Sequence, residues 1–459
     1  MIRHPSKTRR HHESHRIGAV GLTGLGIGGI IGAGYLLGSG ISIRQAGPAV
    51  VITYLLGGVV MAEVMGALTT LATHVPQTTS YREYIARYLG GYAGFFLGWV
   101  IFASGILGLG SEAVAAGVFA HYWLPGIPVA ILATLIVALV LLINLGSIGW
   151  LGLVESILSL IKVIVIAAFI GLVLVVLMIG WPVQHVFTAH PLLPFAPHGW
   201  IGVFNAGLVV IFSYSGVTAV AMATARAKNP KTTVPQAAWG TVLGVTALYT
   251  LGIWALLQIV GWQQVSTTVS PFVLALHQWH IPTGTGILTA VLLVASFTVM
   301  VGSFYATLWV LVSLAEAHEV PSWFCAPKQS GKTVPSRLRL WLWSSAAVYV
   351  SLSTAYLLPQ SAYTDLTAAS SFFSLANWVL ILGAFLRWTQ SDGKHRSVSS
   401  LVFGGRVGAL VTLALLVVLT IQSIRLPALR PGFWAFLGIW GVVTLGFLVT
   451  RRQRTVKTR

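Results

Sequence analysis

The chain has 459 residues, of which 56% are hydrophobic and only 8% are charged, and its mean hydropathy is +0.85. Soluble domains carry about 25% charged residues, so this composition excludes a soluble globular protein and predicts a polytopic membrane protein. The single cysteine, Cys325, excludes an intramolecular disulfide and a cysteine-based metal site.

Apolar runs long enough to cross a bilayer recur along the whole chain. A spanning helix needs ~20 mostly apolar residues, and by this criterion the sequence predicts twelve spans. They cover approximately residues 17–43, 46–72, 91–120, 127–146, 152–180, 200–224, 236–260, 284–315, 338–358, 363–388, 405–424 and 431–450. Because twelve is even, both termini are expected on one side of the membrane.

The basic residues indicate which side that is. In the twelve-span arrangement, 23 of the 27 Lys and Arg residues fall in segments on the side of the termini. Positively charged loops stay in the cytoplasm, so we expect a multi-pass cell-membrane protein with both termini cytoplasmic. The net charge of +18 then reflects orientation and contact with anionic lipid, and no nucleic-acid partner is expected.

The same pattern divides the chain into five segments. They are a cytoplasmic basic tail (1–16), a ten-helix core (17–388), a cytoplasmic linker (389–404), two further transmembrane helices (405–450) and a second basic tail (451–459). The apolar run after the first tail is too long for a signal peptide, so we expect the first span to be retained.

The first span carries the most unusual stretch, GGIIGAGYLLGSG from Gly28 to Gly40. Glycine costs roughly 1 kcal/mol relative to alanine inside a helix. Such a run therefore predicts either very close helix packing or a broken helix. The exposed backbone groups of a broken span must line a cavity or hold a ligand, because hydrocarbon cannot satisfy them.

The sixth span contains a second irregular stretch, Phe212-Ser213-Tyr214-Ser215-Gly216. Spans 1 and 6 are five apart, so two breaks at these positions predict two five-helix repeats of inverted topology. The alternative is that the hydroxyl groups simply bond back to their own helix.

Four ionisable residues stand out in the predicted spans, away from the residues at span ends, namely Glu63, Glu112, Glu155 and Lys162. Charges inside a membrane are costly, so each is a functional hypothesis. A buried lysine can release its proton near neutral pH, which favours a proton-coupling role for Lys162 over a permanently paired one. For Glu112 two roles stay open: it contacts a substrate or carries a proton, or it anchors neighbouring helices. Glu63 and Glu155 are expected to be structural.

In their order along the chain, several motifs resemble the amino acid–polyamine–organocation superfamily, and within it the bacterial amino acid permeases. The resemblance covers about the first 325 residues. Its motifs are Ile31-Gly32-Ala33-Gly34 with Gly38-Ser39-Gly40, Ala46-Gly47-Pro48, Pro76 with Ser80-Tyr81, Gly98-Trp99, Glu112, Gly152 with Ile161-Lys162-Val163, Phe212-Ser213-Tyr214 with Gly216, Lys228-Asn229-Pro230, and Leu314-Ala315 with Pro321.

The resemblance implies an all-α fold of twelve transmembrane helices, with two inverted five-helix repeats broken at helices 1 and 6 and two C-terminal helices. It implies that the substrate binds at both breaks, on Ile31, Gly32, Ala33, Gly34, Phe212, Ser213, Tyr214 and Gly216. N–H groups around Gly32 would take the substrate carboxylate, and carbonyls near Ser213 would take its ammonium group. Lys162 would occupy the place that sodium takes in related symporters, which favours proton coupling over sodium. We expect Lys162 and Glu112 to be the proton-coupling residues.

The sequence departs from the family pattern at several polar positions. Thr69-Thr70 stands where a Gly-Glu pair is usual, Thr218 replaces an acidic residue, Arg226 replaces an acid before Asn-Pro, and span 8 reads Val301-Gly302. The loss of a carboxylate at Thr218 favours neutral or apolar amino acids over strongly cationic ones.

We therefore expect a secondary transporter that carries an amino acid by proton symport with alternating access, without cofactor or metal. One alternative is an exchanger or a carrier of amines or polyamines, and another is a non-transporting sensor on a transporter fold. An enzyme is not expected, because neither Gly-x-Ser-x-Gly nor His-Glu-x-x-His occurs. The sequence leaves the oligomeric state open.

Overall fold

The computed structural model describes residues 18–74, 81–146, 151–179, 194–217, 229–279, 282–327, 333–392 and 397–457. Four groups of positions singled out in the sequence lie outside these ranges: the N-terminal tail, Pro76 with Ser80, Thr218, and Arg226 with Lys228. The side chain of Glu155 is likewise outside the described part.

Nearly all of the described chain is helical, as the apolar runs predict. The helices are α2 (Ala19–Ile30), α3 (Ala33–Leu36), α4 (Ser39–Ala46), α5 (Val50–His74), α6 (Tyr81–Leu89), α7 (Gly91–His121), α8 (Val129–Ile143), α9 (Leu151–Ile179), α10 (Gly199–Ser213), α12 (Pro230–Ile259), α13 (Pro271–Gln278), α14 (Pro282–Glu316), α15 (Arg337–Leu352), α16 (Thr354–Leu357), α17 (Ala362–Gln390), α18 (Arg406–Arg425) and α19 (Arg430–Lys457). Short 3₁₀ turns are η1 (Gly47–Ala49), η3 (Ser215–Val217), η5 (Ser322–Phe324) and η6 (Pro427–Leu429).

One antiparallel hairpin, β1 (Cys325–Pro327) with β2 (Thr333–Pro335), joins α14 to α15. Cys325, at the start of β1, is buried, and this burial raises the pKa of its thiol against the opposing effect of Arg339. The guanidinium of Arg339 also donates to the Cys325 carbonyl at 2.5 Å, which fixes the hairpin to the start of α15.

Eight helical stretches in the described residues are long and apolar enough to cross a membrane. They are Ser39–His74, Gly91–His121, Ile157–Ile179, Thr232–Ile259, Thr283–Glu316, Ala362–Gln390, Arg406–Arg425 and Pro427–Val449. Shorter apolar helices are Ala19–Ile30, Val129–Ile143 and Gly199–Ser213. Two of these, α2 and α10, are short because the chain leaves the helix inside an apolar run, where the sequence predicts breaks.

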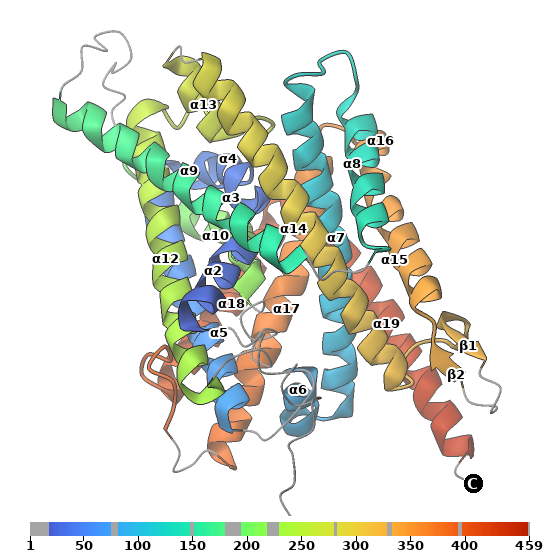
Figure 1. Cartoon of the computed structure of the whole chain (residues 1–459). Helices are drawn as coiled ribbons and strands as arrows, with labels where there is room; N and C mark the ends of the chain where they lie inside the picture. The colour runs from blue at the N-terminus through green and yellow to red at the C-terminus, as the bar shows by residue number, and fades with distance from the viewer. Residues whose placement is uncertain are drawn as a thin grey trace, which may run out of the picture.

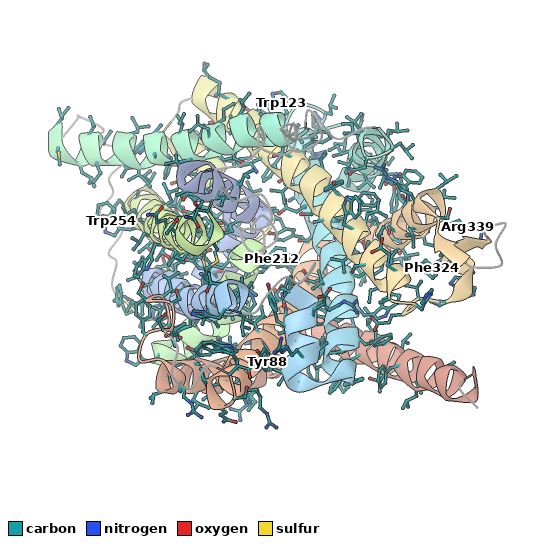
Figure 2. The ribbon with its side chains drawn as sticks, turned by 60° about the horizontal axis from the view of Figure 1, so that its bottom comes forward. Tyr88, Trp123, Phe212, Trp254, Phe324 and Arg339 are labelled. Carbon is teal, nitrogen blue, oxygen red and sulfur yellow. The ribbon has the colours of Figure 1, made fainter. Side chains whose placement is uncertain are left out.

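The helices form a bundle in which α7 is central and packs against α8, α14 and α17 (Figure 1). The long helix α9 runs obliquely across the front of α12, and one end of it lies beside α14 (Figure 1). The short helix α6, the hairpin and the C-terminal end of α19 lie at the end of the bundle opposite α13 (Figure 1). Viewed from that end, Phe212 lies well inside the bundle, whereas Trp123 and Arg339 lie at its periphery (Figure 2). The two breaks are therefore interior features.

The end of the bundle that carries α6 is held by polar contacts between distant segments. Arg82 of α6 pairs with Glu319 beyond the end of α14, and Arg87 pairs with Asp392 beyond α17 at 3.2 Å. The segment 397–405 docks on α5, where the Phe403 N–H donates to Glu63 Oε1 at 2.7 Å. Glu63 therefore has a structural partner, in line with the role expected for it.

Candidate functional site

The first span is interrupted at Ile31 and Gly32. Helix α2 ends at Ile30, Ile31 and Gly32 are extended (φ −73°, ψ 103° and φ −140°, ψ −166°), and α3 begins at Ala33. An extended backbone does not itself need glycine, but a Cβ at position 32 would collide with Glu112 Oε1. Close approach of the acidic side chain is thus what requires Gly32.

The same glycine run also packs closely, so both interpretations of its composition hold. A Cβ on Gly34 would lie only 2.7 Å from Cδ1 of Phe212, and one on Gly38 would lie 3.0 Å from the Tyr363 hydroxyl. A Cβ on Gly28 would collide with Ser159 of α9. Because the run both breaks and packs tightly, the break is enclosed by neighbouring helices.

The regular helix of the sixth span ends close beside this break. Helix α10 ends at Ser213, and the chain continues into η3 before residue 218, beyond which the structure is not described until residue 229. The Ser213 hydroxyl donates to the Gly34 carbonyl at 2.7 Å and more distantly to the Val209 carbonyl in its own helix, at 3.3 Å. The shorter bond joins the first span to the end of α10.

Carbonyls of the first span at and beside the break accept hydrogen bonds from side chains of three other helices. Lys162 Nζ of α9 donates to Gly28 O at 3.2 Å and to Ile31 O at 3.3 Å. Tyr249 of α12 donates to Ile30 O at 3.1 Å. Tyr363 of α17 donates at 2.8 Å to Ala33 O, which also accepts the Leu37 N–H within the helix that follows the break. The carbonyls of Gly28, Ile30 and Ile31 thus find donors in side chains of the protein itself.

Glu112 of α7 approaches the break at its N–H side. Its Oε1 accepts the Ala33 N–H at 2.8 Å, while its Oε2 is buried and has no hydrogen-bond partner among the described residues. The carboxylate also interacts electrostatically with Lys162. Glu112 and Lys162 thus hold the same break through opposite kinds of backbone group.

The ten predicted site residues lie close together around the break. One backbone N–H group has a different partner from the one expected. The Ala33 N–H, expected to meet a substrate carboxylate, is bound to Glu112. Gly216 lies against the end of α2, where a Cβ would be 2.5 Å from Gly29 O. The N–H groups of Gly32 and Gly34 have no partner among the described residues.

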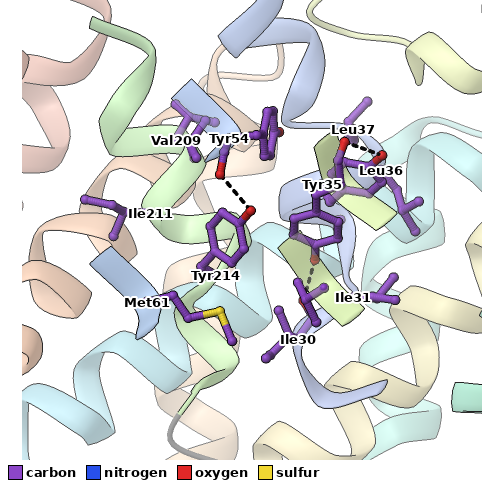
Figure 3. Close-up of a cluster of buried hydrophobic side chains, with 14 of the residues drawn as sticks. Ile30, Ile31, Tyr35, Leu36, Leu37, Tyr54, Met61, Val209, Ile211 and Tyr214 are labelled. Atoms are coloured by element: carbon purple, nitrogen blue, oxygen red, sulfur yellow. Dashed lines mark hydrogen bonds between the residues drawn. The ribbon is translucent and has the colours of Figure 1, made fainter. Parts of the chain in front are cut away.

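Sequence reasoning missed Tyr249 and Tyr363, which supply two of the donors at the break. Tyrosine is ordinary in an apolar helix, so neither stands out. A usable signal is that a buried tyrosine hydroxyl needs a hydrogen-bond partner and that a broken membrane helix needs donors. Tyr249 belongs to a buried cluster with Tyr35, Tyr54 and Tyr214; Figure 3 shows the latter three beside Ile30 and Ile31.

A small depression adjoins the break between α9, α13 and α14. Lys162 is the one charged residue in its wall, and the others are apolar. They include Ile31 and Leu36 from the first span, Phe169 from α9, Phe272 from α13 and Leu292 from α14.

Comparison with known proteins identifies the family of this chain. The profile of the family described as amino acid permease matches residues 21–450. The chain belongs to the amino acid permease family. It is therefore a multi-pass membrane protein of a transporter family for amino acids.

Individual relatives of this permease agree with the family. It is 31% identical over 368 residues to the "Uncharacterized amino acid permease YvbW" of Bacillus subtilis, covering 79% of this chain and 81% of the relative. It is 30% identical over 371 residues to a "Probable GABA permease" of Pseudomonas aeruginosa (80% and 77% covered). It is 27% identical over 449 residues to the "Aromatic amino acid transport protein AroP" of Salmonella typhimurium (95% and 94% covered).

Among solved structures, a mutant manganese transporter of Eremococcus coleocola matches 98% of this permease and 97% of its own chain, with a TM-score of 0.57. At 15% sequence identity, the likeness concerns the fold alone. The permease therefore has the fold of a membrane transporter.

Proposed function

We propose that this permease carries an amino acid across the cell membrane by proton symport, with both termini in the cytoplasm. The observation that carries the proposal is the position of Lys162, whose ammonium group holds the Gly28 and Ile31 carbonyls at the break. Glu112 holds the Ala33 N–H on the other side. Lys162 and Glu112, which can exchange a proton, thus both bind the break in the first span, and this break would move during transport.

The proton step follows from the chemistry of these bonds. A charged lysine makes stronger hydrogen bonds to carbonyls than a neutral amine does. Loss of the Lys162 proton would loosen α9 from the end of α2, and Glu112, which interacts electrostatically with it, is the acceptor or relay for that proton. Protonation would in this way bias the packing of α2 against α9.

The substrate would bind between the two breaks. The N–H groups of Gly32 and Gly34, which have no partner in the described part of the chain, suit a carboxylate. Carbonyls at the end of α10 near Phe212, Ser213 and Tyr214 suit an ammonium group. The residues around Ile31, among them Phe169, Phe272 and Leu292, are apolar, which favours a neutral or apolar substrate side chain. The relative named as an aromatic amino acid transporter supports this choice.

The alternating movement would use two inverted five-helix repeats, giving twelve spans in all. In this assignment α2–α4, α5, α7, α8 and α9 form one repeat, and α10, α12, α14, α15 and α17 form the other. Each repeat then begins with an interrupted helix, which supports the assignment, and α18 and α19 are the two additional helices. Rocking of one group of helices against the other would open the site to each side in turn.

The test is uptake of a mixture of labelled protein amino acids into proteoliposomes, with and without an inward proton gradient, by the wild type and by Lys162→Ala. We expect gradient-driven accumulation that the variant loses. Equal flux without the gradient, when unlabelled amino acids are inside, would instead identify an exchanger. Binding without any flux would identify a sensor and overturn transport.

A further inference from the structure

One hydroxyl joins the ends of the two interrupted spans. Ile30 is the last residue of α2 and Ser213 is the last residue of α10. The Tyr249 hydroxyl lies 3.1 Å from the Ile30 carbonyl and 3.1 Å from the Ser213 carbonyl. A side chain of α12 thus connects the two breaks although it belongs to neither.

This bridge satisfies its two carbonyls only in part. A hydroxyl has one proton to donate, so the two equally distant acceptors must share it. Both carbonyls end a helix, where the aligned peptide dipoles leave partial negative charge. Two such ends facing one place favour a cationic group with several donors over a neutral hydroxyl.

The tyrosine ring holds the hydroxyl in this position. Tyr249 is fully buried and stacks on Tyr35 with ring centroids 3.9 Å apart and an interplanar angle of 6°. The edges or tilted faces of Tyr54 and Tyr214 close the other sides, with centroids 5.9 Å and 5.1 Å away. Packing on three sides therefore places the hydroxyl between the two carbonyls in this structure.

We propose that Tyr249 is a positioning residue that occupies the carbonyls of Ile30 and Ser213 while no substrate is bound and gives them up to the substrate's ammonium group. The proposal rests on the transport function proposed above. An unloaded carrier that changes its orientation needs a donor for these buried carbonyls, whereas a loaded carrier has the ammonium group. The hydroxyl is therefore needed for the unloaded return and not for the loaded passage.

Tyr249→Phe tests this because it keeps the stacked ring and removes only the hydroxyl. Leaving buried acceptors unpaired is a substantial penalty, so we expect gradient-driven net uptake of the labelled amino acid mixture to fall about tenfold. Exchange against unlabelled amino acids inside should stay within about twofold of wild type. Apparent affinity should rise, because the ammonium group no longer displaces a hydrogen bond.

Tyr35→Phe is the matched control. Tyr35 is equally buried in the same stack, but its hydroxyl donates to carbonyls within α12, those of Tyr249 at 3.2 Å and Leu248 at 3.4 Å. Its loss should leave the ratio of net uptake to exchange unchanged. The proposal would be overturned if Tyr249→Phe changed net uptake and exchange equally, or changed neither. It would also be overturned if Tyr35→Phe changed the ratio of net uptake to exchange as Tyr249→Phe does.

A second measurement tests the role of Tyr249 even if Tyr249→Phe does not fold. It also distinguishes failure of this role from failure of the proposed transport function. 3-Fluorotyrosine at position 249 keeps the ring and hydroxyl but makes the hydroxyl a stronger donor, so apparent affinity for the mixture should fall. An unchanged or increased affinity would overturn the role of Tyr249. If the wild type binds the mixture but moves none of it, the proposed transport function is refuted. Opposite shifts of apparent affinity in Tyr249→Phe and in the 3-fluorotyrosine variant would still support the role of Tyr249.

Discussion

The first span and the helix that follows it satisfy their backbones in different ways. Helix α5 runs unbroken from Val50 to His74 and forms its own hydrogen bonds, as a helix in lipid must. The first span is broken at Ile31 and Gly32, and its carbonyls are bound by side chains of α9, α12 and α17. An unbroken span is self-sufficient, whereas a broken span depends on every helix that donates to it.

The largest effect on uptake is expected when the charge of Lys162 is removed. Lys162→Met keeps an unbranched side chain of similar length but leaves the Gly28 and Ile31 carbonyls without their charged donor. We expect gradient-driven uptake to fall about 10–100-fold, since hydrogen bonds to charged groups are worth ~1.5–3 kcal/mol. Uptake into proteoliposomes measures this.

The control for this variant is Ile164→Met on the same helix. Ile164 is 55% exposed in the described structure, so the substitution places the same side chain away from the break and should leave uptake unchanged. Equal losses in the two variants would mean that α9 is merely destabilised by the change.

A pair of glutamates sharpens the comparison further. Glu112 on the broken span's neighbour and Glu63 on the unbroken α5 are alike: each accepts one backbone N–H through Oε1, and each has an Oε2 with no hydrogen-bond partner among the described residues. Glu112→Gln keeps an acceptor for Ala33 and removes the ionisable group. We expect gradient-driven uptake to fall about tenfold while exchange persists.

Glu63→Gln should behave differently because its partner, Phe403, lies in the linker segment. We expect a lower melting temperature for this variant, with an unchanged dependence of uptake on the proton gradient. A loss of proton dependence in Glu63→Gln but not in Glu112→Gln would transfer the coupling role to the end of α5.

The smallest effects concern glycines of the first span. Gly32→Ala places a Cβ against Glu112, and overpacking of this kind costs about 1–3 kcal/mol, so we expect a lower melting temperature and reduced uptake. Gly24→Ala meets nothing within 4 Å and should stabilise α2 by about 0.5–1 kcal/mol. Melting temperatures of the two purified variants measure the contrast, and equal shifts would refute it.

The sequence singled out the glycine run, with a break as one of two interpretations, and its charged neighbours, because both violate a rule that membrane spans normally obey. The glycine run from Gly28 to Gly40 is unfavourable in a regular helix, and Lys162 and Glu112 are unfavourable in lipid. The structure places the break at Ile31 and Gly32 and both charges on it. The resemblance to the permeases, stated from ordered motifs, is confirmed by the family match.

The tyrosine donors could not be predicted because they violate no such rule. Tyr249 reaches Ile30 across 219 positions, and Tyr363 reaches Ala33 across 330. Such pairings follow from helix packing, which local patterns do not encode. For the same reason the sequence indicated that Glu63 is structural but could not name its partner, which lies 340 positions away.

The lone cysteine makes this chain convenient to label. Cys325 is buried at the start of the hairpin, and burial raises the pKa of its thiol, so little reactive thiolate forms at neutral pH. A cysteine introduced at an accessible position such as Gly24 would react with maleimides well before the native one. Spectroscopic probes could therefore be attached near the break while every native residue that binds it stays in place.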